Sequence, residues 1–142
     1  MKKILSKMIE LLVHFYSGNS EPSQRMVNQR IARKFNLWVA EKKFCRPDAP
    51  LASIAEEFGV SEEELSYFFS TVVGSRFSTV RKRLRLEEAR RLINENPWMK
   101  LIQVANRVGI MDKCNFRRQF KEMYGYTPSE WQRECQHGRE MK

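Results

Sequence analysis

The chain is 142 residues long, which allows one compact domain or two very small ones. Its composition, 42% apolar and 11% aromatic, is sufficient for a hydrophobic core and argues against a disordered chain. Lysine and arginine number 26 against 17 acidic residues, which gives a formal charge of +9. So basic a domain indicates a polyanionic partner, either nucleic acid or an anionic membrane surface.

The sequence argues against the membrane. No segment approaches the roughly 18 uninterrupted apolar residues that a spanning helix needs. The basic N-terminus resembles a signal peptide only superficially, because Glu10 and His14 interrupt its apolar run and no small-residue cleavage site follows. The cysteines Cys45, Cys114 and Cys135 form no CxxC motif, which predicts free thiols in a reducing compartment. We therefore expect a cytoplasmic protein with no membrane partner.

Two helices are predicted in the first third of the chain. Apolar residues recur at spacings of three and four over about residues 3–16, which predicts a short amphipathic helix. This helix either covers the core of the domain that follows or serves for dimerisation or partner docking. Residues 17–23 have the composition of a linker, so we expect residues 1–23 to form a separate segment. A second helix is predicted over about residues 24–44 and stops before Pro47.

The remainder of the chain repeats itself. Ala55 and Gly59 recur fifty positions later as Ala105 and Gly109. Repetition at a fixed offset indicates two copies of one helical unit, each too small to fold alone. A long helix, predicted over about residues 77–95, joins the copies. Alternating patterns typical of strands are absent from the sequence, and we therefore expect an all-α fold.

Each copy has the outline of a helix-turn-helix, the first over about residues 51–74 and the second over about residues 100–125. In the first copy, Gly59 stands where the turn needs a positive φ, and Ser61 with the glutamate three residues later makes a capping box. In the second copy the turn is one residue longer, and Asp112 is the predicted cap. The second helix of such a motif can enter the major groove of DNA.

Four stretches of the chain carry a more specific signal. They are RLEEARRLI at 85–93, IQVANRVG at 102–109, NFRRQFK at 115–121 and GYTPSEW at 125–131. With these stretches, residues from about 51 to 131 resemble the DNA-binding domain of the AraC family of bacterial transcription regulators. The preceding helix and the segment after it resemble the Bacteroides-type members.

The resemblance implies a DNA-binding domain over residues 24–137, in which the long helix joins the two helix-turn-helix units, followed by a polar tail at 138–142. It also implies that one monomer places two recognition helices in adjacent major-groove segments, roughly 34 Å apart. The expected protein is a sequence-specific regulator of transcription that is cytoplasmic and nucleoid-associated. It is expected to bind double-stranded DNA as a monomer or a homodimer.

The second recognition helix, predicted over residues 112–124, has a basic and polar face. Arginine and lysine can pair with guanine in the major groove and asparagine with adenine. Lys121 is expected to lie along the phosphates, which position the protein without specifying sequence. The alternative is that this face is simply the solvated side of an amphipathic helix. Matching to the family motif places five residues at groove-facing positions: Lys113, Cys114, Asn115, Arg117 and Arg118.

The first recognition helix is acidic. Residues 51–77 contain one basic residue, Arg76, against five glutamates, and the family match places Glu63, Ser66 and Tyr67 at groove-facing positions. Three glutamates in the first helical turn stabilise the helix by interacting with its macrodipole, but they oppose a phosphate there. We therefore expect the second unit to dominate base recognition. In a competing interpretation, the acidic first unit docks on another regulator or on RNA polymerase, and DNA binding is weak.

In the long helix, the resemblance implies that Arg85 is chiefly structural and pairs with acids at the junction of the units. Val80 and Arg81 depart from the family pattern, which prefers a bulky aromatic and an apolar residue at these positions. Lys82 and Arg83 are expected to form a solvated face rather than to bind DNA.

No combination of residues that supports catalysis stands out, so we expect no enzymatic activity and no cofactor. Cys135 and His137 lack partner ligands, and no metal site is expected. Cys114 is interpreted as a small neutral residue at a groove position rather than as a redox sensor. The three tryptophans occupy helical apolar positions and are expected in the core: Trp38, Trp98 and Trp131.

Overall fold

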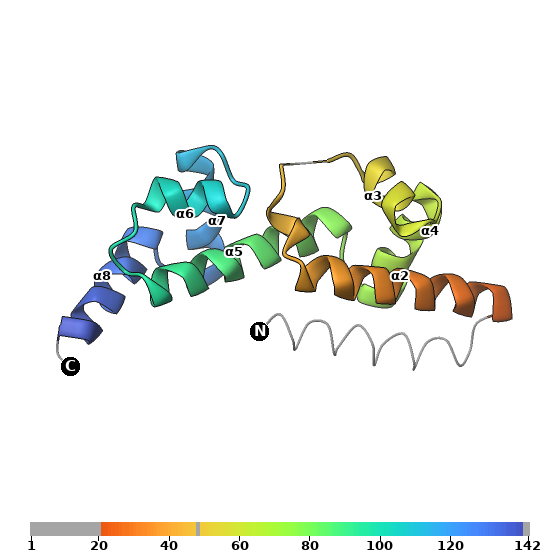
Figure 1. Ribbon diagram of the computed structural model, residues 1–142, viewed down its shortest axis with the longest axis horizontal. Coiled ribbons are helices and arrows are strands. Elements are labelled where there is room, and N and C mark those ends of the chain that lie inside the picture. The colour runs from red at the N-terminus through yellow and green to blue at the C-terminus, as the bar shows by residue number, and fades with distance from the viewer. Residues whose placement is uncertain (1–20, 48, 141–142) are drawn as a thin grey trace. The chain divides into compact units, whose positions relative to one another are not determined.

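The computed structural model describes residues 21–47 and 49–140, and every regular element in these ranges is helical (Figure 1). The predicted all-α fold is therefore confirmed, whereas the helix predicted over residues 3–16 lies outside the described residues. The elements in chain order are α2 Pro22–Ala40, η1 Lys43–Cys45, α3 Leu51–Phe58, α4 Glu62–Phe68, η2 Phe69–Val73, α5 Phe77–Glu95, α6 Leu101–Arg107, α7 Lys113–Tyr124 and α8 Pro128–Glu140.

The described residues divide into two compact units, and α5 contributes to both. The N-terminal unit takes residues 21–43 and 49–81, and the C-terminal unit takes residues 44–47 and 82–140. We call residues 44–47 the lead-in segment. Although they precede the first helix-turn-helix in the sequence, they belong to the unit that contains the second one.

Aromatic side chains form the core of the N-terminal unit. Phe35 and Trp38 project from α2 and are 0% and 2% exposed. The Phe35 ring lies 5.2 Å from Phe69, and the Trp38 ring lies 5.4 Å from Phe77, measured between ring centroids. The Phe35 and Phe69 rings meet edge-on, which is an arrangement that the aromatic quadrupole favours. The apolar side of α2 therefore packs on the first helix-turn-helix and on the start of α5.

The bounds of α2 differ from those predicted. The helix begins at Pro22, inside the predicted linker, because proline is well suited to the first helical position. It ends at Ala40, since Lys42 adopts a positive φ of 55°, and the chain continues into the 3-10 turn η1. Residues 41–44, predicted as the last turn of this helix, instead form a turn in which the chain changes direction before residues 44–47.

The core of the C-terminal unit joins α5 to α6 and α7. Leu86, Ala89 and Ile93 of α5 are buried with residues of the other two helices, among them Val104 and Phe120. Three aromatic rings border this core and surround the guanidinium of Arg90: Tyr124, Tyr126 and Trp131. The Cζ atom of Arg90 lies 4.5 Å from the centroid of the Trp131 ring. Such cation–π contacts add to the packing of α5 against the start of α8.

Three side chains fasten α8 to the end of α5 and the turn after it. Gln132 Nε2 donates to the Met99 carbonyl at 2.6 Å, and Gln136 Nε2 donates to the Pro97 carbonyl at 2.7 Å. Arg139 donates to the Asn94 carbonyl at 2.6 Å. Because of these contacts the helix continues to Glu140, so residues 138–140, which were expected in a polar tail, are helical.

Trp98 does not lie in the core, and the sequence expectation for it is wrong. Its side chain is 58% exposed, whereas Trp38 is buried and Trp131 is half-buried. The helical spacing that would bury residue 98 ends at Glu95, and the buried Pro97 opens a turn there. The Trp98 amide bonds the Asn96 side chain within that turn, which directs the indole outward.

Candidate nucleic-acid interface

The first helix-turn-helix consists of α3, a short turn and α4. Gly59 has the expected left-handed conformation, with φ 72°. The predicted capping box is present, because the Ser61 hydroxyl accepts from the Glu64 amide at 3.1 Å and the Glu64 carboxylate accepts from the Ser61 amide at 2.9 Å. Arg30 of α2 also donates to the Gly59 carbonyl at 3.2 Å, which ties the turn to α2.

The second helix-turn-helix consists of α6, a longer turn and α7. The predicted cap Asp112 accepts from the Asn115 amide at 2.8 Å. Gly109 has φ 84°, and a Cβ atom there would lie 2.6 Å from the backbone oxygen of Cys45. Glycine is thus needed at 109 both for its conformation and for the close approach of the lead-in segment.

Arg85 holds the lead-in segment in place. The side chain is buried, with 7% exposed, and donates from Nε to the Phe44 carbonyl at 2.6 Å and from Nη2 to the Arg46 carbonyl at 2.7 Å. Charge-assisted hydrogen bonds of this kind are strong. The structural role expected of Arg85 is therefore supported through backbone carbonyls, and its pairing with acids stays a prediction. By this contact α5 fixes the segment against which the turn before α7 packs.

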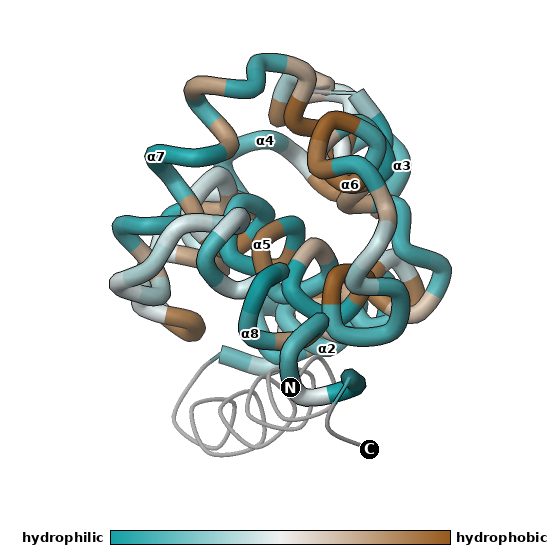
Figure 2. Tube along the Cα trace, turned by 90° about the vertical axis from the view of Figure 1, so that its left-hand side faces the viewer, coloured by the Kyte–Doolittle hydropathy of each residue, from teal (hydrophilic) through white to brown (hydrophobic). Residues whose placement is uncertain are grey.

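The side chains of α7 divide sharply between two faces. Phe116 and Phe120 are buried, at 2% and 0% exposed. Most of the other residues along α7 are hydrophilic (Figure 2). Of the six residues predicted to bind DNA, Asn115 is half-buried and five are exposed: Lys113, Cys114, Arg117, Arg118 and Lys121.

Asn115 positions a neighbour as well as lying at the predicted face. Its side-chain oxygen accepts from Arg118 Nη2 at 2.5 Å. The other terminal nitrogen of Arg118 lies 3.9 Å from a Glu122 oxygen. Both contacts of Arg118 are exposed and contribute little to the free energy of folding, but they hold its guanidinium against the surface of α7. Arg117 makes no ion pair with any other described residue and projects into solvent.

The candidate residues of α4, Glu63, Ser66 and Tyr67, are all exposed, and the Tyr67 side chain is 52% exposed. Glu64 is engaged in the capping box, while Glu62 and Glu63 face solvent. The Tyr67 carbonyl accepts from the hydroxyls of Ser70 and Thr71, at the point where α4 continues into the π-helical η2. The N-terminal unit therefore presents carboxylates where the C-terminal unit presents guanidinium and ammonium groups.

Sequence reasoning did not single out Met111. This side chain is 69% exposed and directly precedes the α7 cap, so it lies beside the basic face. The signal that could have found it is the extra residue in the second turn, which places an apolar side chain at the outer edge of the loop. Met111 is therefore a candidate for contact with an apolar groove feature such as a thymine methyl group.

A cluster of metal ligands and a membrane-spanning helix are both absent from the described residues. Within residues 21–47 and 49–140, no group of three or more histidine, cysteine or acidic side chains is arranged to hold a metal ion. The three cysteines are free thiols, as predicted, and burial raises the pKa of the Cys135 thiol. None of the helices described is both long and apolar enough to cross a membrane.

Comparison with known proteins points in the same direction. A family model described as a helix-turn-helix domain matches residues 54–134. The chain is 28% identical over 120 residues to YpdC of Escherichia coli K12, an uncharacterized HTH-type transcriptional regulator, and covers 40% of the length of that relative. This alignment takes in 84% of the present chain.

Solved structures show the same fold. The C-terminal domain of AraT, a response regulator from Geobacillus stearothermophilus, is 26% identical with a TM-score of 0.62, and the match covers 80% of this chain and 86% of that one. A transcriptional regulator from Chromobacterium violaceum with an AraC-type DNA-binding domain shares the fold at a TM-score of 0.65 and 21% identity, covering 75% of this chain and 92% of that one.

Proposed function

Because the chain belongs to the AraC-type helix-turn-helix family of DNA-binding transcriptional regulators, we propose that it recognises a specific sequence in double-stranded DNA chiefly through α7. In this proposal α7 lies in one major-groove segment, and α4 lies in an adjacent segment and contributes less. A protein that binds in this way associates with the nucleoid.

The observation that carries the proposal is the composition of the exposed face of α7. From Lys113 to Lys121 the helix contains no acidic residue, and its buried face is anchored by Phe116 and Phe120. An arginine that bonds O6 and N7 of guanine discriminates against other bases by about 1–3 kcal/mol. We assign this role to Arg117 and Arg118.

The remaining predicted residues of α7 take different parts. Lys113 and Cys114 lie in the first turn, the part of a recognition helix that contacts base edges. Asn115 positions Arg118 through their 2.5 Å hydrogen bond. Lys121 lies two turns further on, where a flexible ammonium group reaches a phosphate. The proposal thus assigns base contacts to residues 113–118 and a phosphate contact to Lys121, nearer the end of α7.

In the N-terminal unit, Glu63, Ser66 and Tyr67 are exposed and suited to select bases rather than to supply affinity. A glutamate accepts a hydrogen bond from the amino group of cytosine, but it repels the phosphates on either side. We therefore assign to α4 a selective part that adds little binding free energy.

The test begins with selection of a binding site from random duplex oligonucleotides, followed by affinity measurements on Arg117→Ala. Loss of a base contact weakens binding to the selected site by about 5- to 150-fold and relaxes the preference at one base pair. Arg33→Ala is the matched control, because Arg33 is an exposed arginine on α2 and its loss changes the net charge equally. Equal weakening by both variants would contradict the assignment of α7.

The exposed carboxylates of α4 favour one alternative, in which this surface docks on another regulator or on RNA polymerase. The two functions differ in their salt dependence. A DNA-binding protein that neutralises several phosphates loses affinity steeply as salt rises, with a log–log slope of about −0.9 per phosphate. An interaction module shows little affinity for DNA at any salt concentration.

A further inference from the structure

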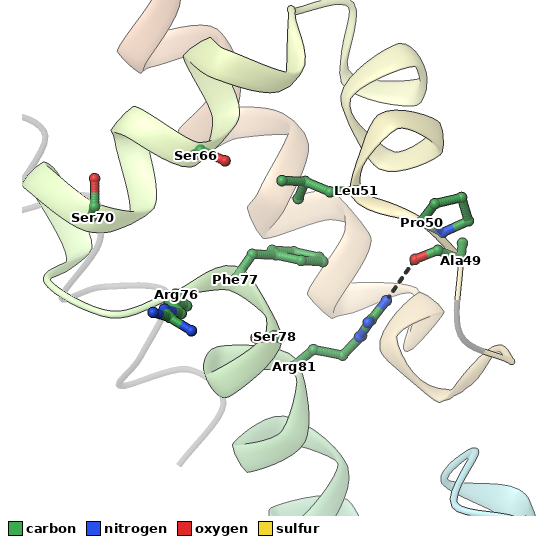
Figure 3. A pocket seen from close by; sticks show the side chains of 9 residues that line it. All are labelled: Ala49, Pro50, Leu51, Ser66, Ser70, Arg76, Phe77, Ser78 and Arg81. Carbon is green, nitrogen blue, oxygen red and sulfur yellow. Dashed lines mark hydrogen bonds between the residues drawn. The ribbon is translucent and has the colours of Figure 1, made fainter.

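A pocket of about 550 Å³ opens in the N-terminal unit, beside α4 (Figure 3). Ser66 and Ser70 of α4 and η2 form one side, and the start of α5 forms another. Leu51, at the beginning of α3, and Phe77 give it an apolar interior. The volume falls in the range of roughly 300–1,000 Å³ that small-molecule sites occupy.

Two arginines line this pocket, Arg76 and Arg81. The side chain of Arg81 is held in place, because Nη1 donates to the Ala49 carbonyl at 3.3 Å and the guanidinium lies 5.4 Å from the centroid of the Phe77 ring (Figure 3). Arg76 is exposed and immediately precedes α5. A guanidinium group is the residue of choice for binding a carboxylate or a phosphate.

The charge at this pocket contrasts with the unit around it. Arg76 is the one basic residue among residues 51–77, which carry five glutamates, yet none of the described residues that line the pocket is acidic. The hydroxyl groups of Ser66 and Ser78 add hydrogen-bond donors to the two guanidinium groups, while the Ser70 hydroxyl donates to the Tyr67 carbonyl. The lining therefore combines a local positive charge with an apolar surface.

We propose that this pocket binds a small organic anion, a carboxylate or phosphate monoester with an aromatic or branched apolar body. The acid group faces the guanidinium and hydroxyl groups, and the apolar body packs against Leu51 and Phe77. The binding itself does not depend on the function proposed above. Ser66 lies both in this pocket and on the candidate DNA-binding face of α4. An effect of the bound anion on DNA binding therefore rests on the proposed function.

A DNA phosphate is a second source of the same anionic chemistry. The apolar interior favours a free small molecule, since the sugar–phosphate backbone offers no comparable apolar body to Leu51 and Phe77. The experiment must therefore separate the two sources, and it must detect binding in the absence of DNA.

The amide resonances of Ser66, Ser70 and Ser78 in the full chain report on the pocket during NMR titrations with benzoate, phenyl phosphate, inorganic phosphate and neutral benzyl alcohol. We expect saturable shifts of these three resonances with benzoate and phenyl phosphate at millimolar concentration, and much smaller shifts with the other two probes. Arg76→Gln is expected to weaken binding about tenfold or more, as loss of a charge-assisted bond does. Arg83→Gln is the matched control, because Arg83 is an exposed arginine of α5 outside the pocket.

Arg81→Met provides a second variant, which keeps an unbranched apolar stem and is checked for folding by its spectrum. Three results would overturn the proposal. The first is the absence of saturable shifts, and the second is equal binding by Arg76→Gln, Arg81→Met and the wild type. The third is a duplex that shifts these resonances while benzoate and phenyl phosphate do not, which would make the pocket a DNA-backbone contact. Loss of DNA binding by Arg117→Ala leaves these titrations unchanged, so the two proposals fail separately.

Discussion

Replacing Gly109 by alanine tests the contact between the second turn and the lead-in segment. Gly109 has φ 84°, and an added Cβ atom would lie 2.6 Å from the Cys45 oxygen and 3.2 Å from the Arg46 oxygen. Both of these atoms belong to the backbone, and Arg85 bonds the Arg46 carbonyl at 2.7 Å. The segment cannot yield without disturbing a buried arginine.

The magnitude follows from two costs. A non-glycine residue in the left-handed region costs about 1–2 kcal/mol. Forcing an extra carbon into a packed site adds about 1–3 kcal/mol. We therefore expect Gly109→Ala to lower the free energy of unfolding by about 2–5 kcal/mol.

Gly59→Ala is the matched control for this prediction. Gly59 has φ 72°, but nothing lies within 4 Å of the position that its Cβ would take. Gly59→Ala is therefore destabilised only by the left-handed backbone conformation. Alanine reduces the conformational entropy of the unfolded chain equally in both variants, so this effect cancels in the comparison. The difference between them, about 1–3 kcal/mol, measures the close approach itself.

The assay is urea denaturation followed by circular dichroism, with amide hydrogen exchange in α6 and α7 to locate the loss in the C-terminal unit. We expect exchange in these two helices to accelerate in Gly109→Ala and to stay near wild type in Gly59→Ala. Equal destabilisation by the two variants would refute the contact with the lead-in segment.

Three further predictions concern other parts of the chain. Arg85→Met leaves the Phe44 and Arg46 carbonyls without their donor and is expected to cost about 2–4 kcal/mol in urea denaturation, whereas Lys82→Met, an exposed change on the same helix, costs under about 0.5 kcal/mol. Replacing Glu62 and Glu63 by alanine is expected to leave the affinity for the selected DNA unchanged or higher, and a tenfold loss in a binding titration would contradict the subordinate role of α4. Burial raises the pKa of Tyr124 from 10.0 to about 12, so the neutral phenol contributes stability below pH 10 that is lost as the pH rises from 10 to 12. In Tyr124→Phe the loss of stability over this pH range is expected to be smaller, as measured by urea denaturation at each pH.

Local chemistry determined what could be predicted. The capping box at Ser61, the cap at Asp112 and the positive φ of Gly59 each depend on residues close together in the sequence, and all three are present. The long helix predicted between the two copies of the repeat ends before Pro97, and α5 covers the predicted range. The exposed and buried faces of α7 likewise follow from helical spacing.

Contacts between distant residues could not be predicted in the same way. The approach of Cys45 to Gly109 joins positions far apart in the chain, and no local pattern announces it. Trp98 was misplaced because a helical period was extended across a turn. The pocket beside α4 depends on Arg76, Arg81 and Ser66 coming together from separate elements, which composition alone does not reveal.

The course of the backbone through the two units has a practical consequence for dissecting the protein. The lead-in segment belongs to the C-terminal unit, whereas residues 21–43 before it and residues 49–81 after it belong to the N-terminal unit. No single cleavage point separates the two units whole, and a fragment that starts at residue 82 lacks Cys45 and Arg46, which the turn at Gly109 approaches. A fragment designed to isolate the second helix-turn-helix must therefore carry residues 44–47 joined to its N-terminus. Without them, the guanidinium of Arg85 loses the Phe44 and Arg46 carbonyls to which it donates.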